Sequence, residues 1–245
     1  SLVYRLAWMF ASRCVPVLAV DLDPQANLTS MFLGVNELSL LWPEHDVNHT
    51  IYGAIQPMMR GIGDIAPPQV LEILPNLRLL AGDLGLSRFE DKLSEAWGRC
   101  QLQDEAALRI TTAFHRVIRA ASVWGAELVL VDVSPSLGAI NRAALLAADH
   151  LCVPLNSDLF SLQSLRNLGP TLRLWRDSWS KIRPHAPRDL ALPKGQLNAI
   201  GYVLTQHGAC ATRPMEAYQT WMDAIPASYQ AAMTYEAHKG QTRPA

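Results

Sequence analysis

The chain has 245 residues, of which 49% are hydrophobic and 18% charged, and its formal net charge is −1. This composition is typical of a globular protein and excludes a disordered one, and the length is enough for one substantial core. A balanced charge gives the chain as a whole no bias toward nucleic acid or membranes, so any basic surface has to be local. We expect a single domain over residues 1–230 and a flexible tail over 231–245.

The elements can be predicted in chain order from the spacing of apolar residues. That spacing predicts a helix over 2–10, a strand over 17–20, a helix or turn over 24–32, a short helix near 50–55 among loops, a strand over 76–81, a helix from residue 83, a helix over 105–124, a strand over 127–133, a helix over 138–148, a strand over 150–154, a helix over 157–175, a strand over 197–205 and a helix over 213–224. Such alternation indicates an α/β fold with a mostly parallel, twisted sheet and helices on both faces.

Acidic residues stand where two of these strands end. Within VPVLAVDLDPQANLTS, Asp21 and Asp23 follow an apolar strand, and Asp132 ends the strand in ELVLVDV. Ligands of parallel α/β sheets bind at the carboxyl ends of the strands. The alternative is that each aspartate only caps its turn. Because both strands end in acid and lead into a turn that contains proline, we favour a functional site.

These segments carry a family resemblance. DLDPQANLTS, from Asp21, resembles the DLDPQGNAT-type segment of the ParA branch of the ParA/MinD deviant Walker A ATPases, and VLVDVSPSLG, from Val129, resembles their Walker B and second switch. ADHLCVPLNSDLFSLQSL and GYVLTQ are similar to later family segments, and the likeness covers residues 1–225. The resemblance implies a SIMIBI-like P-loop NTPase fold that uses ATP and Mg²⁺.

The resemblance also implies roles for individual residues. Asp23 matches the aspartate that positions the attacking water. Asp132 matches the Walker B acid that holds Mg²⁺ through water, and Asp21 is expected to support the Mg²⁺ environment and the strand end. The remaining positions expected at the nucleotide are Ser1, Gln25 and Pro135. Phosphoryl transfer needs a metal-holding acid and a separate acid that orients water, and two strand ends supply both.

One family element is absent from the printed residues. The glycine-rich loop KGGxGKT, whose amide groups and lysines hold the phosphates, occurs nowhere in the chain. We interpret the chain as a member without its phosphate loop and the strand before it. We expect that such a chain has two unpaired strand edges, is unstable and does not hydrolyse ATP. Ser134 also replaces the first proline of the family's D-x-P-P segment.

A local basic stretch lies in the second half of the chain. Its candidate DNA-binding residues are Arg166, Arg173, Arg176 and Arg183. Their spacing near helical periodicity suits phosphate contacts. The alternative is a solvated helix face on which Trp175 and Trp179 pack inward.

Taken with the resemblance, these features favour a ParA-type partition ATPase for chromosome or plasmid segregation. It would dimerise around ATP, bind DNA non-specifically and respond to a ParB-like, DNA-bound activator. We expect a cytoplasmic, nucleoid-associated protein without a membrane partner. Two alternatives stay open: a related ATPase that positions another cargo, and a non-catalytic remnant that only binds a partner. A Rossmann dinucleotide site is excluded because no GxGxxG precedes Asp21.

Overall fold

The computed structural model describes residues 1–42, 49–156, 158–205 and 215–233. Its chain divides into two compact units, one formed by residues 1–148 with 180–195 and the other by residues 149–179 with 196–245. The single domain expected over 1–230 stays a prediction. The expected tail lies outside the described residues from residue 234 onward.

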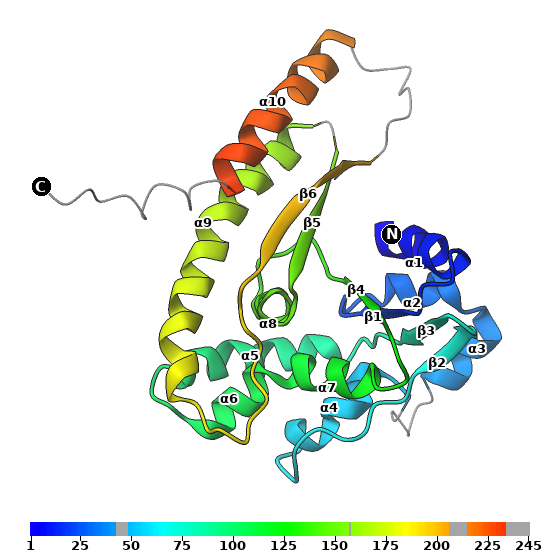
Figure 1. Ribbon diagram of the computed structural model, residues 1–245, viewed down its shortest axis with the longest axis vertical. Coiled ribbons are helices and arrows are strands. Elements are labelled where there is room, and N and C mark those ends of the chain that lie inside the picture. The colour runs from blue at the N-terminus through cyan, green and yellow to red at the C-terminus, as the bar shows by residue number, and fades with distance from the viewer. Residues whose placement is uncertain (43–48, 157, 206–214, 234–245) are drawn as a thin grey trace, which may run out of the picture. The chain divides into compact units, whose positions relative to one another are not determined.

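The predicted elements occur in the expected order, with additions and one interruption given below (Figure 1). The helices are α1 (Leu2–Ser12), α2 (Asn27–Phe32), α3 (Val35–Leu41), α4 (Ile51–Met59), α5 (Leu86–Cys100), α6 (Glu105–Thr111), α7 (Ala113–Ala121), α8 (Ala139–Ala147), α9 (Leu159–Ile182) and α10 (Met215–Met233), with a short 3-10 turn at Arg183–His185. The strands are β1 (Val17–Asp21), β2 (Leu71–Leu74), β3 (Leu77–Leu80), β4 (Leu128–Asp132), β5 (His150–Leu155) and β6 (Asn198–Leu204).

The first unit contains a four-stranded sheet in the order β2-β3-β1-β4. β1 pairs in parallel with β3 and with β4, whereas β2 runs antiparallel to β3. The prediction of an α/β fold with a mostly parallel sheet is therefore confirmed. β4 is the last strand of this sheet within the described part of the chain, and the two unpaired edges expected from a missing strand stay a prediction.

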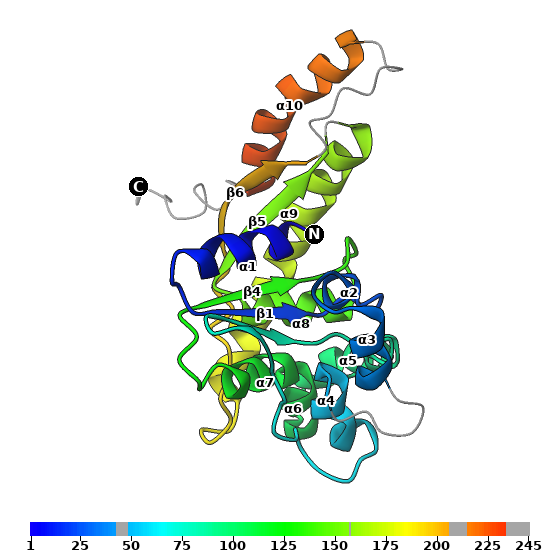
Figure 2. The ribbon, with the colours of Figure 1, turned by 90° about the vertical axis from the view of Figure 1, so that its right-hand side faces the viewer.

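Helices cover both faces of this sheet because β1 is apolar on both sides. Leu18 and Val20 pack with residues of α4, α5, α7 and α8. Val17 and Ala19 face the other way and pack with α1, α2 and α3. Alternate residues of a strand point to opposite faces, so a fully buried strand needs an unbroken apolar run. Figure 2 shows α1 and α2 on one side of β1 and α4 and α7 on the other.

Three local predictions needed correction. The helix expected over 105–124 is interrupted at Thr112, whose φ of −98° and ψ of 7° lie outside the helical range. Thr112 Oγ1 donates to Leu108 O at 2.8 Å, a side-chain bond that competes with the helical ladder. The region 34–69 holds α3 in addition to the one short helix expected. β2 was not predicted at all.

The second unit has a two-stranded parallel sheet, β5-β6. Leu155 of β5, Leu162 and Leu165 of α9, and Ile225 of α10 share one buried cluster. At Gly169 any side chain would collide with the backbone carbonyl of Ala232, so the glycine permits α9 and α10 to approach closely. None of the helices in the described residues combines the length and apolar content that crossing a membrane requires.

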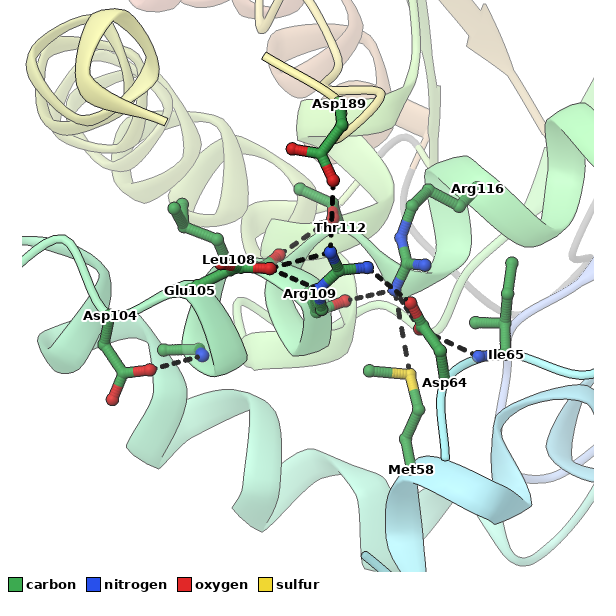
Figure 3. Close-up of polar contacts among 11 residues, drawn as sticks. Met58, Asp64, Ile65, Asp104, Glu105, Leu108, Arg109, Thr112, Arg116 and Asp189 are labelled. Carbon is green, nitrogen blue, oxygen red and sulfur yellow. Dashed lines mark hydrogen bonds and ion pairs between the residues drawn. The ribbon is translucent and has the colours of Figure 1, made fainter. Parts of the chain in front are cut away.

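A cluster of ion pairs joins α6 and α7 to the segment that follows α4 in the first unit (Figure 3). Arg109 Nη1 and Arg116 Nη2 each lie 2.8 Å from a carboxylate oxygen of Asp64. Arg109 also pairs with Glu105 at 2.7 Å and with Asp189 at 3.6 Å. Burial alone would raise the pKa of Asp64, but hydrogen bonds from Arg116, the Ile65 amide and Arg109 outweigh it and lower that pKa.

Candidate active site at the strand ends

The two strand-end acids lie side by side at one edge of the sheet. β1 and β4 pair in register from Val17 and Leu128 through to Asp21 and Asp132. The amide of Leu22 then donates to the carbonyl of Asp132 at 2.9 Å and extends the pairing by one residue. The parallel arrangement thus brings together acids that are far apart in the sequence, at the position where ligands of such sheets bind.

Asp21 is fully buried and its carboxylate is occupied by hydrogen bonds. Thr29 donates to Asp21 Oδ2 through both its amide and its hydroxyl at 2.8 Å, and the Asp23 amide donates to Oδ1 at 3.1 Å. The Thr29 hydroxyl also accepts from the Gly82 amide at 2.8 Å. Burial raises the pKa of Asp21 to about 6 in spite of these bonds. Asp21 therefore joins the end of β1 to α2 and, through the Thr29 hydroxyl, to Gly82, two residues after β3.

Asp23 is held in a tight turn directly after this strand. Its Oδ1 accepts from the Gln25 amide at 3.0 Å, and its Oδ2 accepts from Asn27 Nδ2 at 3.4 Å. The Ala26 amide donates to the Asp23 carbonyl at 2.8 Å and closes the turn. Ala26 has φ 51°, a left-handed conformation that costs an alanine about 1 kcal/mol. The side chain of Gln25 is exposed.

Ser1 reaches Asp132 across the site. Its hydroxyl donates to Asp132 Oδ1 at 3.0 Å and accepts from the Val3 amide at 3.2 Å, so the same group caps α1. Burial raises the pKa of Asp132, the hydrogen bond from the Ser1 hydroxyl acts against this, and the charge of Asp23 adds to it. Asp132 in turn adds to the raised pKa of Asp21. The charges of Asp132 and Asp21 and those of Asp132 and Asp23 therefore repel each other.

The loop after β4 presents Pro135 to solvent. Ser134 Oγ and Ser136 Oγ lie 3.1 Å apart, and both carbonyl groups of these serines accept from Asn141 Nδ2 at 2.6 Å. Asn141 and Thr29 were missed in the sequence, although Asn141 is a polar residue in the mostly apolar segment AINRAALLA. Such a residue is a signal, because buried polar groups need partners.

Asp132 and Ser1 suit a magnesium ion. Mg²⁺ is held in proteins by one or two carboxylates together with water and phosphate oxygens, and hydroxyl groups also serve. The raised pKa of Asp132 fits a carboxylate that gains stability when a cation binds. Within the described residues no group of three or more His, Cys, Asp or Glu side chains is placed to hold a metal ion.

The candidate DNA-binding arginines are divided between the units. Arg166 is exposed on α9 in the second unit, where Arg173 Nη1 donates to the carbonyl of Ala232 at 3.2 Å. Trp175 and Trp179 are buried, as the alternative of an inward-packing helix face predicts. Arg176 also belongs to the second unit, whereas Arg183 belongs to the first. Their contact with DNA stays a prediction.

Comparison with known proteins identifies the family. A family model described as an AAA domain, AAA_31, matches residues 1–183. The chain is 29% identical over 188 residues to the "Probable plasmid-partitioning protein ParA" of Thermus thermophilus. This alignment covers 77% of the chain and 50% of that relative. It is 30% identical over 162 residues to the "Chromosome partitioning protein ParA" of Caulobacter vibrioides, with 66% and 52% covered. The chain therefore belongs to the AAA-domain family of ParA-type ATPases.

Solved structures share the fold. Protein DIP2308 from Corynebacterium diphtheriae superposes with a TM-score of 0.76 at 22% identity, covering 95% of the chain and 83% of that structure. Cobyrinic acid a,c-diamide synthase from Mycobacterium smegmatis, solved with bound ATP analog and magnesium, gives a TM-score of 0.55 at 21% identity, with 92% and 74% covered. The chain spans about half the length of the two partitioning relatives it matches.

Proposed function

We propose that this chain belongs to an ATP-dependent partition ATPase and binds Mg²⁺-ATP at the carboxyl ends of β1 and β4. The observation that carries the proposal is the register that sets Asp21 beside Asp132, with the Ser1 hydroxyl 3.0 Å from the Asp132 carboxylate. The names of the sequence relatives favour partition over another use of the same fold, since the fold alone also hosts a synthase.

The residues divide the work of phosphoryl transfer between them. Asp132 and Ser1 would hold Mg²⁺, which when bound neutralises charge on the phosphate oxygens. Asp23 would orient the attacking water. Its carboxylate direction is fixed by the Gln25 amide and by Asn27, so little reorganisation is needed when a water binds. Asp21 keeps the turn of Asp23 attached to the strand through the Asp23 amide.

The proposals for dimerisation, DNA binding and a partner protein rest on the family to which the chain belongs. We propose that two copies enclose the nucleotide, that the ATP-bound dimer binds DNA non-specifically, and that a ParB-like, DNA-bound partner stimulates hydrolysis. Exposed Arg166 and the neighbouring arginines of α9 would supply phosphate contacts. The protein would then act at the nucleoid in the cytoplasm.

Two substitutions test the site in the product of the whole reading frame that encodes this chain. Asp132→Asn should weaken Mg²⁺-dependent ATP binding by about tenfold or more, because the carboxylate that holds the hydrated Mg²⁺ loses its charge. Asp23→Ala should keep ATP binding and dimerisation and lose turnover. Binding can be followed by titration with a fluorescent ATP analogue with and without Mg²⁺, and turnover by phosphate release.

The matched control is Asp91→Asn, an exposed aspartate on α5 in the same unit. It should leave both measurements unchanged. If Asp23→Ala abolished ATP binding, the water-positioning role would be wrong. If Asp132→Asn bound Mg²⁺-ATP as tightly as the unaltered protein, the proposed metal site would fail.

A further inference from the structure

One carboxylate from a different helix caps the helix that follows the active-site loop. α8 begins directly after residues 133–138, the loop that follows Asp132, and its cap residue Gly138 has no side chain to accept hydrogen bonds. The amides of Ala139 and Ile140 instead donate to Glu90 of α5, to Oε1 and to Oε2 respectively, the second at 2.7 Å. A single side chain, about 50 residues upstream, therefore satisfies two free amides of the first turn.

Gly138 is what allows this contact. Its φ of −79° and ψ of −175° are extended values that any residue adopts, so the backbone does not require glycine there. A β-carbon at this position would collide with Glu90 Oε1 and approach Glu90 Cδ to 3.2 Å. The carboxylate of Glu90 thus occupies the space that a side chain at position 138 would take.

The other end of the loop is held by α8 itself. Asn141 is buried and donates to the carbonyls of Ser134 and Ser136, both at 2.6 Å. Because Asn141 lies less than one turn after the capped amides, the cap and the loop carbonyls are parts of the same rigid turn of helix. Fixing the start of α8 therefore fixes the path of the loop between Asp132 and Gly138.

Charge favours the same arrangement. A carboxylate at a helix N-terminus interacts favourably with the helix dipole. Arg142, in the first turn of α8, lies over the ring of Trp97 from α5 at 4.5 Å. Burial lowers the pKa of Arg142, and the charge of Glu90 opposes that shift. α5 and α8 are therefore connected by polar contacts as well as by apolar packing.

We propose that Glu90 is a positioning residue for the active-site loop: it caps α8 in place of a local cap residue and so sets the conformation of residues 133–138. The inference rests on the proposed function only in that this loop adjoins the Mg²⁺ site at Asp132. Glu90 itself lies on α5, and its carboxylate bonds run to α8.

Amide hydrogen exchange of the chain, measured without nucleotide, tests the cap. Glu90→Ala should speed exchange in peptides covering 133–141 by about tenfold, the effect expected for loss of a helix cap. Peptides from β1 should be unchanged. The control is Glu95→Ala, which removes the same side chain from an exposed position on the same helix, where it pairs only weakly with Arg99 at 3.7 Å.

A rescue variant separates capping from general packing. Gly138→Asp places a local cap acceptor at the cap position. In the unaltered chain it should speed exchange of 133–141, because the new side chain collides with Glu90 and the two carboxylates repel each other, so neither can cap α8 as well as Glu90 does alone. In the Glu90→Ala background the same substitution should slow exchange back toward the original rate. This reversal of sign is the specific signature of a cap that can be supplied from either residue.

The inference is overturned if Glu90→Ala leaves 133–141 unchanged, if faster exchange spreads through the whole unit, or if Gly138→Asp fails to rescue. A failure of the proposed function gives a different result: Mg²⁺-ATP would then not bind, while the exchange pattern of the four variants would stand.

Discussion

The fold shifts the pKa values of two groups of acids in the first unit in opposite directions. Asp64 lies 2.8 Å from Arg109 and from Arg116, and its pKa is lowered. Asp21 and Asp132 lie beside one another at the strand ends, and their pKa values are raised, chiefly by burial. The first arrangement stabilises a negative charge with arginines from the chain. The second keeps negative charge that the chain only partly compensates, which is the arrangement expected of a site that binds a cation.

The largest expected effect concerns pH. The pKa of Asp21 is about 6 in the fold and 3.8 as the ordinary value, so the folded state binds more protons between these pH values. The free energy of unfolding should therefore fall as pH rises from about 4 to 6, by about 3 kcal/mol from this group. Asp64, with its lowered pKa, acts in the opposite direction and loses its stabilisation only as the pH falls below the ordinary value.

Urea unfolding at a series of pH values checks this prediction. The difference in unfolding free energy between the unaltered chain and Asp21→Asn should slope downward between pH 4 and 6 and be flat above that range. A difference that does not change with pH would show that the Asp21 carboxyl titrates normally. Asp64→Asn is the comparison, and its difference curve should slope the other way at low pH.

An intermediate effect is expected from the arginine cluster. Arg116→Met should lower the free energy of unfolding by about 2 kcal/mol, because it removes one of two cations from Asp64 and a donor to the Arg109 carbonyl. Only part of the loss known for buried ion pairs is expected, since the Asp64 side chain is 36% exposed. Urea unfolding at pH 7 measures the loss. Glu95→Gln, at an exposed pair with Arg99, should change stability by less than about 0.5 kcal/mol.

The smallest effect has the opposite sign. Asp132→Asn should stabilise the chain in the absence of Mg²⁺ and nucleotide by about 1 kcal/mol, because it removes a charge whose pKa is raised by burial and by Asp23. Thermal unfolding in a chelating buffer would show it as a higher Tm. A clear loss of stability would contradict this prediction and show that the charge of Asp132, like that of Asp64, stabilises the fold.

The sequence predicted that the acids lie at the carboxyl edge of the sheet, but it did not predict the side-chain contacts around them. The acids of β1 and β4 could be placed together because parallel strands share one carboxyl edge. Glu90 could not be connected with α8, since nothing local relates residue 90 to residues 139 and 140. The break at Thr112 was missed for another reason: the apolar period continues across it, and the interruption lies in the backbone angles of Thr112, whose hydroxyl also bonds to the Leu108 carbonyl.

β2 was not predicted from the sequence for a third reason. Its four residues, LEIL, alternate weakly between half-buried and exposed positions and follow a pair of prolines. A short edge strand of this kind is defined by its antiparallel pairing with β3 more than by its own composition. The shift of register between Glu72 and Leu74 in that pairing interrupts the alternation further.

The pairing of β1 with β4 also bears on the order in which the chain folds. The register joins Val17 to Leu128, so the middle strand of the sheet acquires one of its neighbours only after more than a hundred further residues have been made. Contacts so distant in sequence form slowly, and on a ribosome they must wait for synthesis to pass β4. Asp21 and Asp132 consequently become neighbours late, and the site is completed together with the sheet rather than before it.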